Sequence, residues 1–356
     1  MSNYLLAGGG TGGHVNPLLA LAEEIRKHEP SALIWALGTS EGLESRLVPE
    51  RGFELLTIDR LPFPRRLNAR AFTFPFRFAR AVSQVVAMLK TKNVDVVVGF
   101  GGYASAPAYF AAKISGVPFV VHEANALPGL ANRLGARFAA AVAVCFSNTK
   151  LARASVVGMP IRAELVDIAA RRDAKAARAH FGLHDAPTLL VTGGSLGAKS
   201  INDTIVASMN LLRAAGIQLL HISGDRADLP ELHEPDRVRL SYCNQMQLAI
   251  AASSFAVARA GASTVAEFAA VGIPAVFVPY PVGNGEQKFN VVELVASHGA
   301  ISVDDADFTP EFVANVLIPT ISNSKKTAAM AKAAKAVGIT DGAHRLYLLV
   351  RGVLSK

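Results

Sequence analysis

Short apolar runs alternate with longer amphipathic stretches along the whole chain. The runs that predict strands lie at residues 4–7, 32–37, 53–58, 94–98, 119–122 and 140–144, and then at 188–191, 217–222, 238–240, 255–258 and 275–278. Helical periodicity follows the first strand at residues 17–28 and the seventh strand up to residue 212. Strands that alternate with helices are typical of parallel sheets built from βαβ units. The pattern therefore predicts an α/β protein with two doubly wound halves and a cleft between them.

The pattern restarts near residue 160, where Gly158 and Pro160 interrupt the chain. We expect a first domain at residues 1–160 and a second at residues 161–340. Residues 341–356 predict one further amphipathic helix, with an apolar face formed by Leu346, Leu349, Val350 and Val353.

The composition narrows the class of protein. The 356 residues are 51% hydrophobic and 18% charged, which excludes a wholly disordered chain. No uninterrupted apolar run reaches about 18 residues, so no spanning helix is expected, and the N-terminus does not resemble a signal peptide. The two cysteines, Cys145 and Cys243, lie in apolar runs and indicate a reduced, cytosolic chain. A net charge of +8 favours an anionic partner, which is nucleic acid, a phospholipid surface or a phosphorylated substrate.

Three glycine-rich loops follow predicted strands. Residues 8–14 open the first helix and are suited to an anion, because glycines allow close backbone approach to the helix N-terminus. Read literally, this loop matches G-x-G-x-x-G, with Glu41 as a candidate ribose-binding acid of a dehydrogenase, although a tight turn without a ligand also fits. Residues 193–200 nearly match a Walker A loop, which binds nucleoside triphosphates, but Ala198 replaces a required glycine. Residues 99–103 form the third loop.

Other polar residues are candidates for binding or catalysis. Residues 259–267 predict a helix start that faces phosphate, with Glu267 placed either to bind sugar hydroxyls or to favour the helix dipole. His14, at a helix N-terminus, should be neutral and is either a base or a polar cap. His122 and Glu123 end a strand and either line or cap the cleft. Asp305 and Asp307 form a D-x-D pattern that we interpret as a solvated turn rather than a metal site.

Taken together, these motifs resemble one family. GGGTGGHVNP at residues 8–17, GFGGYASAP at 99–107, HEANALPG at 122–129, VGMPIR at 157–162, GGSLGA at 193–198 and RAGASTVAE at 259–267 occur in order, followed by the pair Gln287 and Asn290. The chain resembles the bacterial MurG family over roughly residues 4 to 350. The resemblance implies the GT-B fold, with two Rossmann-like domains that face a deep cleft and a final helix that packs back on the first domain.

The resemblance also implies the activity. It is that of an inverting hexosyltransferase, which moves N-acetylglucosamine from UDP-N-acetylglucosamine (UDP-GlcNAc) to the 4-hydroxyl of N-acetylmuramic acid in lipid I and makes lipid II. The first domain would bind the acceptor and the membrane, and the second would bind the donor. His14 is the candidate general base. No metal ion and no cofactor are expected, because helix N-termini and glycine-loop amides would stabilise the leaving diphosphate.

Site residues follow by matching position. In the first half, Thr11, Gly12 and Gly13 would contact the diphosphate and sugar, Asn125 would bind N-acetylglucosamine, and Arg162 would lie near the donor. In the second half, the expected UDP-GlcNAc contacts are Ser195, the backbone at Cys243, the helix start formed by Ala262, Ser263, Thr264, Val265, Ala266 and Glu267, and Gln287. Glu267 would bind the ribose hydroxyls. The sequence departs from the family at Ala124, where Gln is usual, and at Met159, where Asn is usual.

The expected location is the cytoplasmic face of the cell membrane, as a peripheral protein. Residues 61–80 interleave five phenylalanines with five arginines, Phe63, Phe72, Phe74, Phe76 and Phe78 with Arg65, Arg66, Arg70, Arg77 and Arg80. This composition suits an anionic bilayer, although the phenylalanines could instead pack in the core. The expected partners are UDP-GlcNAc, lipid I and an anionic membrane surface, not nucleic acid, with cell-wall or division proteins left open. The alternatives are another GT-B transferase, or a non-catalytic subunit that binds sugar nucleotides or membranes.

Overall fold

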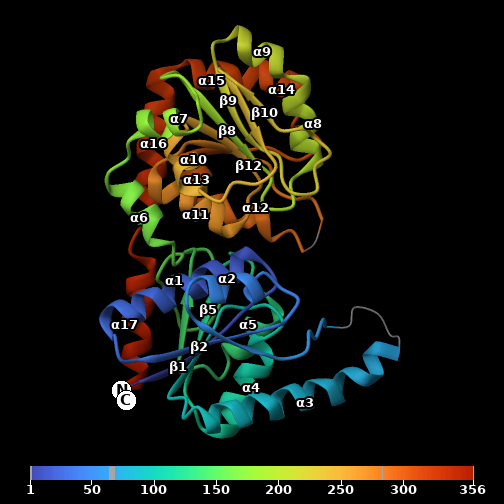
Figure 1. Ribbon diagram of the computed structural model, residues 1–356, viewed down its shortest axis with the longest axis vertical. Helices are drawn as coiled ribbons and strands as arrows, with labels where there is room; N and C mark the ends of the chain where they lie inside the picture. Colours follow the sequence, from blue (N-terminus) through green and yellow to red (C-terminus); the bar gives the residue numbers. More distant parts are fainter. Residues whose placement is uncertain (1, 64–68, 283, 356) are drawn as a thin grey trace. The chain divides into compact units, whose positions relative to one another are not determined.

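The computed structural model describes residues 2–63, 69–282 and 284–355 (Figure 1). The chain divides into two compact units. The first comprises Met1–Arg162 together with Asp341–Lys356, and the second comprises Ala163–Thr340.

The first unit is built on a parallel sheet with the strand order β3-β2-β1-β4-β5-β6-β7. Its strands are β1 (Asn3–Ala7), β2 (Leu33–Gly38), β3 (Glu54–Thr57), β4 (Val96–Gly99), β5 (Phe119–Glu123), β6 (Ala141–Val144) and β7 (Ala154–Val156). Its helices are α1 (Gly12–His28), α2 (Glu44–Glu50), α3 (Ala69–Thr91), α4 (Ser105–Ser115), α5 (Leu130–Gly135) and α17 (Gly342–Leu354).

The second unit repeats this plan with the strand order β10-β11-β9-β8-β12-β13-β14, in which only the β10–β11 pair is antiparallel. Its strands are β8 (Thr188–Thr192), β9 (Gln218–Ile222), β10 (Leu232–Glu234), β11 (Arg237–Leu240), β12 (Phe255–Ala258), β13 (Ala275–Phe277) and β14 (Ala300–Ser302). Its helices are α6 (Ala163–Ala170), α7 (Ala174–His180), α8 (Lys199–Ala207), α9 (Met209–Ala214), α10 (Met246–Ala252), α11 (Ala262–Val271), α12 (Glu286–Asn290), α13 (Val292–Ala296), α14 (Pro310–Phe312), the π-helical turn η1 (Val313–Leu317), α15 (Ile318–Ser322) and α16 (Ser324–Val337).

The central strands are buried and largely apolar because helices cover both faces of each sheet. In β1, alternate side chains enter different cores. Leu5 packs with residues of α3 and α4, whereas Tyr4 and Leu6 pack with residues of α1 and α17. This two-sided burial confirms the predicted doubly wound α/β class.

The differences from the predicted elements lie at sheet edges and helix ends. β7, β10 and β14 were not predicted, and each lies at the edge of its sheet and has only three residues. An edge strand buries less side-chain surface, so it needs no recognisable apolar pattern. α1 begins at Gly12 rather than at residue 17, and the helix predicted up to residue 212 is divided at Ser208 into α8 and α9.

The C-terminal helix α17 belongs to the first unit and packs against α1 (Figure 1). Leu346 and Val350 are fully buried, and Leu349 and Val353 pack against the same core. The predicted apolar face is therefore the buried one. A Cβ on Gly342 would lie 2.3 Å from the carbonyl oxygen of Met159, so glycine is needed where α17 enters the unit.

Within the described ranges, no helix combines the length and the apolar character that crossing a membrane requires.

We predict that Leu346→Ala will lower the free energy of unfolding of the first unit by about 2–5 kcal/mol, because it leaves a cavity where α17 meets the core. Leu348, 54% exposed on the same helix, supplies the matched control, and Leu348→Ala should change stability by less than about 0.5 kcal/mol. Urea unfolding followed by circular dichroism measures both. Equal effects of the two variants would contradict the packing of α17 described here.

Candidate active site

The glycine-rich loops of the first unit gather at one edge of its sheet. They follow β1 and β4, the loop at residues 124–129 follows β5, and these three strands are neighbours in the strand order. The carboxyl ends of parallel strands lie at the same edge. In doubly wound sheets this edge is where ligands bind.

His14 lies in the first turn of α1 and is partly buried. Its Nδ1 atom lies 3.1 Å from the carbonyl oxygen of Gly9 and 3.3 Å from the hydroxyl of Thr11. A carbonyl can only accept a hydrogen bond, so Nδ1 carries the proton and Nε2 keeps a lone pair. Burial lowers the pKa of His14, and this outweighs the hydrogen bond to Gly9 and the charge of Glu44, which raise it. The imidazole is therefore neutral at pH 7 and can accept a proton at Nε2.

The loop after β4 lies close against His14 and the first glycine loop. A Cβ on Gly101 would lie 3.1 Å from Nε2 of His14, and a Cβ on Gly102 would lie 2.5 Å from the carbonyl oxygen of Gly9. Both glycines also have positive φ angles, of 91° and 77°. The two loops thus touch through backbone atoms, which only glycine permits here.

A buried carboxylate, that of Glu44, holds the first glycine loop. Glu44 accepts hydrogen bonds from the Gly10 amide at 2.8 Å and from the Thr39 amide and hydroxyl at 2.9 and 2.8 Å. Its side chain is fully buried, and a Cβ on Gly9, Gly38 or Gly42 would lie within 2.5 Å of it. Burial alone would raise the pKa of Glu44, but the backbone hydrogen bonds outweigh burial and hold the pKa below its ordinary value. Sequence reasoning missed this residue, although the glycines beside an acidic side chain were a usable signal.

The loop after β5 is organised by a second buried carboxylate, that of Glu123. It accepts hydrogen bonds from the amides of Asn125 and Gly129 at 2.8 and 3.0 Å and from Nδ2 of Asn132 at 2.9 Å. Burial raises the pKa of Glu123, and these donors only partly offset the effect. His122 is fully buried, and burial lowers its pKa to about 4. Glu123 therefore supports the loop from within the fold, whereas Nε2 of His122 lies 3.4 Å from the carbonyl oxygen of Gly158.

The structure brings together part of the predicted set in the first unit. Thr11, Gly12 and Gly13 lie at the start of α1 with His14, and Asn125 is partly exposed on the loop that Glu123 holds. Arg162 is the last residue of this unit's first segment. Ala124 and Met159, the two departures from the family pattern, are 3% and 2% exposed.

In the second unit, the corresponding glycine loop borders a cavity of about 1200 Å³. Residues 193–200 line it, including Ser195, together with Gln287, Arg259, Tyr280 and Asp305. A Cβ on Gly197 would lie 2.2 Å from the carbonyl oxygen of Ser223, so the loop lies directly on the turn after β9. The cavity is large enough for a nucleotide sugar.

Residues 305–307 form the predicted turn, and Asp307 is exposed, but the side chain of Asp305 is partly buried in the cavity wall. It forms an ion pair with Arg259 and accepts a hydrogen bond from Ser200 at 2.7 Å, and Arg259 donates to the same serine at 2.9 Å. The arginine comes from the loop after β12, so the contact is visible only in the fold.

The predicted phosphate-facing helix is α11, which begins directly after Gly261. Its first amides have no partner within the helix, as at every helix N-terminus. The hydroxyl of Ser263 is buried and has no hydrogen-bond partner among the described residues. Ala262 and Val265 are buried, whereas Thr264, Ala266 and Glu267 are partly exposed.

Two further predicted residues lie on neighbouring segments. Gln287, on α12, accepts a hydrogen bond from the Tyr280 amide at 2.9 Å. Asn290, one turn later, is buried and donates to the carbonyl oxygen of Ala260 at 3.0 Å, which ties α12 to the loop before α11. Cys243 is partly exposed in the segment after β11. Cys243 and the α11 residues do not line the 1200 Å³ cavity.

Comparisons with known proteins agree along the whole chain. Residues 4–144 match the glycosyltransferase family 28 N-terminal domain, and residues 188–346 match the corresponding C-terminal domain. The chain is 53% identical over 356 residues to the UDP-N-acetylglucosamine–N-acetylmuramyl-(pentapeptide) pyrophosphoryl-undecaprenol N-acetylglucosamine transferase of Leifsonia xyli, covering 100% of this chain and 99% of that protein. It is 45% identical over 353 residues to the protein of the same name from Streptomyces coelicolor, covering 98% and 97%.

A crystal structure supports the same assignment. MurG of Acinetobacter baumannii superposes with a TM-score of 0.79 over 99% of this chain and 100% of that one, at 28% identity. The fold and the glycine loops define a GT-B glycosyltransferase. Within that class, the chain belongs to the MurG family of N-acetylglucosamine transferases. The predicted fold class and family are thus confirmed, and the dehydrogenase and triphosphatase alternatives are not supported.

Glu44→Gln should destabilise the first unit by about 1–3 kcal/mol at neutral pH, because an amide cannot accept from both sides of the loop. A depressed carboxyl pKa contributes stability above the unfolded-state value, and this contribution is lost as the pH falls through the folded-state value. The difference between wild type and variant should therefore shrink on acidification. Urea unfolding at a series of pH values measures it, and a difference that grows in acid would contradict an ionised Glu44.

Proposed function

We propose that this chain transfers N-acetylglucosamine from UDP-GlcNAc to the 4-hydroxyl of the N-acetylmuramyl group of lipid I, the undecaprenyl-pyrophosphoryl acceptor. The carrying observation is the family match over the full length, combined with a neutral His14 whose Nε2 lies beside the glycine-rich loop after β4. The relatives are named for this donor and this acceptor.

In the proposed mechanism, the acceptor hydroxyl attacks the anomeric carbon of N-acetylglucosamine as the bond to the UDP oxygen breaks. The configuration at that carbon inverts because the nucleophile enters opposite the leaving group. Nε2 of His14 takes the hydroxyl proton, and the electrons of the broken bond leave on the diphosphate.

The second unit would bind the donor. Amides of the glycine loop at residues 193–197 and of the α11 N-terminus would stabilise the charge on the leaving diphosphate. A phosphate oxygen would also satisfy the buried Ser263 hydroxyl. We assign Ser195 to the diphosphate, Glu267 to the ribose, Gln287 to the sugar and Cys243 to the uracil. Thr11, Gly12, Gly13, Asn125 and Arg162 remain predicted donor contacts of the first unit.

The purified chain, incubated with UDP-GlcNAc and a lipid I analogue, should release UDP and add one N-acetylhexosamine mass to the analogue.

His14→Ala should lower kcat by ~10²–10⁴-fold, with little change in UDP binding. The wild-type rate should fall in acid only below the usual imidazole range, because the pKa of His14 is lowered. His180→Ala, an exposed histidine on α7, is the control. Near-normal turnover by the His14 variant would reduce this residue to a structural role.

We also propose that the protein binds the cytoplasmic face of the membrane through the outer face of α3. Phe74 and Phe78 pack against the core, whereas Phe72 and Phe76 are 75% and 80% exposed. The second pair lies two residues away from the first, which places it on the opposite side of the helix. The predicted phenylalanines thus divide between core and surface, because one helix has both faces.

Basic side chains accompany this apolar surface. Arg77 and Arg80 are exposed on α3, and Lys113 on the adjacent α4 lies 3.9 Å from the ring centre of Phe138, which is 55% exposed. Cations beside exposed aromatic rings favour an anionic bilayer. Arg65 and Arg66 lie outside the described residues, as does the side chain of Arg70.

Replacement of both Phe72 and Phe76 by serine should weaken binding to anionic lipid vesicles at least ~10-fold, because each ring loses about 1.5–3 kcal/mol of apolar transfer energy. Vesicle sedimentation measures this loss, and turnover of a short-chain soluble acceptor should stay close to wild type. Leu211→Ser, at a 45% exposed position on α9, is the matched control. Undiminished sedimentation of the double variant would exclude α3 as the membrane surface.

A further inference from the structure

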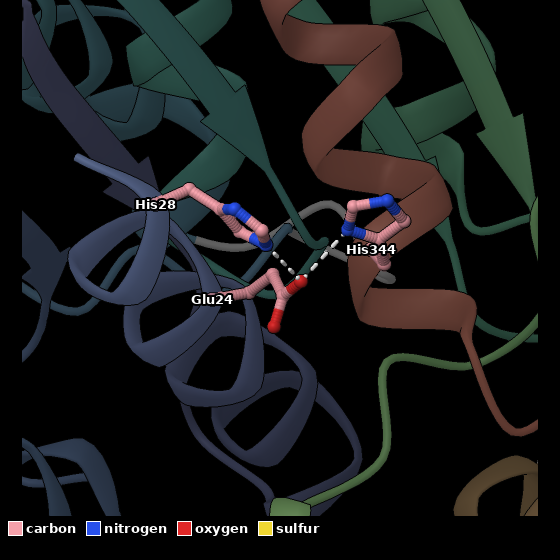
Figure 2. A group of neighbouring side chains, drawn as sticks. All are labelled: Glu24, His28 and His344. Carbon is pink, nitrogen blue, oxygen red and sulfur yellow. Dashed lines mark hydrogen bonds and ion pairs between the residues drawn. The ribbon is translucent and has the colours of Figure 1, made fainter.

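Three metal-ligating side chains converge where α1 meets α17, well away from the site described above (Figure 2). Nε2 of His28 and Nδ1 of His344 each lie 2.9 Å from the same carboxylate oxygen of Glu24. All three ligand atoms lie within 4.8 Å of one another. His14 is ten residues before Glu24 on the same helix, which corresponds to about 15 Å along its axis.

The fold holds these side chains in place without any help from a ligand. Glu24 and His28 are one turn apart on α1, and so share a face of the helix. The ring of His28 stacks on that of Tyr347, with centres 4.9 Å apart and planes 13° apart. His344 lies two residues after Gly342, where close contact with the Met159 carbonyl fixes the start of α17. Few rearrangements are therefore needed to bring the three donor atoms onto one ion.

The chemistry of the three donors is selective. Glu24 is only 15% exposed, whereas the side chains of His28 and His344 are 35% and 42% exposed, so an ion can enter from solvent. Two imidazole nitrogens with one carboxylate oxygen suit Zn²⁺ and similar transition metals rather than Mg²⁺ or Ca²⁺.

We propose that Glu24, His28 and His344 bind a late first-row divalent metal ion, for which Zn²⁺ is the probe. The ligand atoms are Nε2 of His28, Nδ1 of His344 and a carboxylate oxygen of Glu24, and solvent completes the coordination. Each neutral imidazole keeps its single proton by moving it to the other ring nitrogen, and an imidazolium releases one proton to solvent. Acid therefore weakens binding. The ion joins α1 to α17 and stabilises the first unit by mass action.

The experiment uses the full-length protein after treatment with a chelator. Native mass spectrometry should show one Zn²⁺ per chain, and the Tm should rise with added Zn²⁺ and fall back with EDTA. Titration calorimetry of His344→Gln and of Glu24→Gln should show that Zn²⁺ binds at least ~10-fold more weakly. Loss of a residue that only hydrogen-bonds to a metal ligand already lowers metal affinity by that factor. His233→Gln, an exposed histidine on β10, should bind as wild type does.

The outcomes distinguish a metal site from contacts of Glu24 with the two histidines that bind no metal. Loss of the Zn²⁺-dependent rise in Tm in both ligand variants, with the rise kept in His233→Gln, supports the site. Equal Zn²⁺ affinity in wild type and in His344→Gln would overturn it, as would the absence of a one-to-one complex. Both variants need only be folded at the titration temperature, which circular dichroism verifies, and His28→Gln provides a third test if either is not.

Discussion

The geometry of the first unit's site depends on the hydrogen bonds that the buried carboxylate of Glu44 accepts. This carboxylate accepts three hydrogen bonds from Gly10 and Thr39, and three glycines leave room for it. Without it, the amide of Gly10 and the buried amide and hydroxyl of Thr39 would lose their acceptor, and a buried donor left without an acceptor costs about 1–3 kcal/mol. The Gly9 carbonyl, in the same loop, directs the proton of His14 to Nδ1. The carboxylate thus anchors the loop whose Gly9 carbonyl orients the candidate base.

Each unit has a glycine loop at its candidate site, and the two loops are held in different ways. In the first, glycine loops meet through backbone contacts beside a neutral histidine. In the second, the glycine loop borders a cavity whose wall is held by the ion pair of Arg259 with Asp305, and Ser200 bonds to both. Backbone amides at helix N-termini bind anions without a mobile charge, which suits a reaction whose leaving group is a diphosphate.

The C-terminal helix α17 connects the last residues of the chain to the first unit. Leu346 and Val350 bury its apolar face, and His344 brings a polar side chain to Glu24 and His28 on α1. An apolar interface of this kind stabilises the unit without requiring particular polar residues at its edge. A metal ion at that rim would add a stabilising link that responds to ion supply and to pH.

The sequence by itself determined the doubly wound class, the strands of both sheet centres and the family, because buried central strands need apolar runs and phosphate-binding loops need glycines at defined positions. It also placed His14 at the start of a helix. Only the tertiary structure decided the edge strands β7, β10 and β14, the partners of Glu44 and Asp305, and the division of the α3 phenylalanines between core and surface. Those features depend on contacts between residues far apart in the chain, such as Arg259 with Asp305 or Glu44 with Gly10, and local sequence patterns carry no record of such contacts.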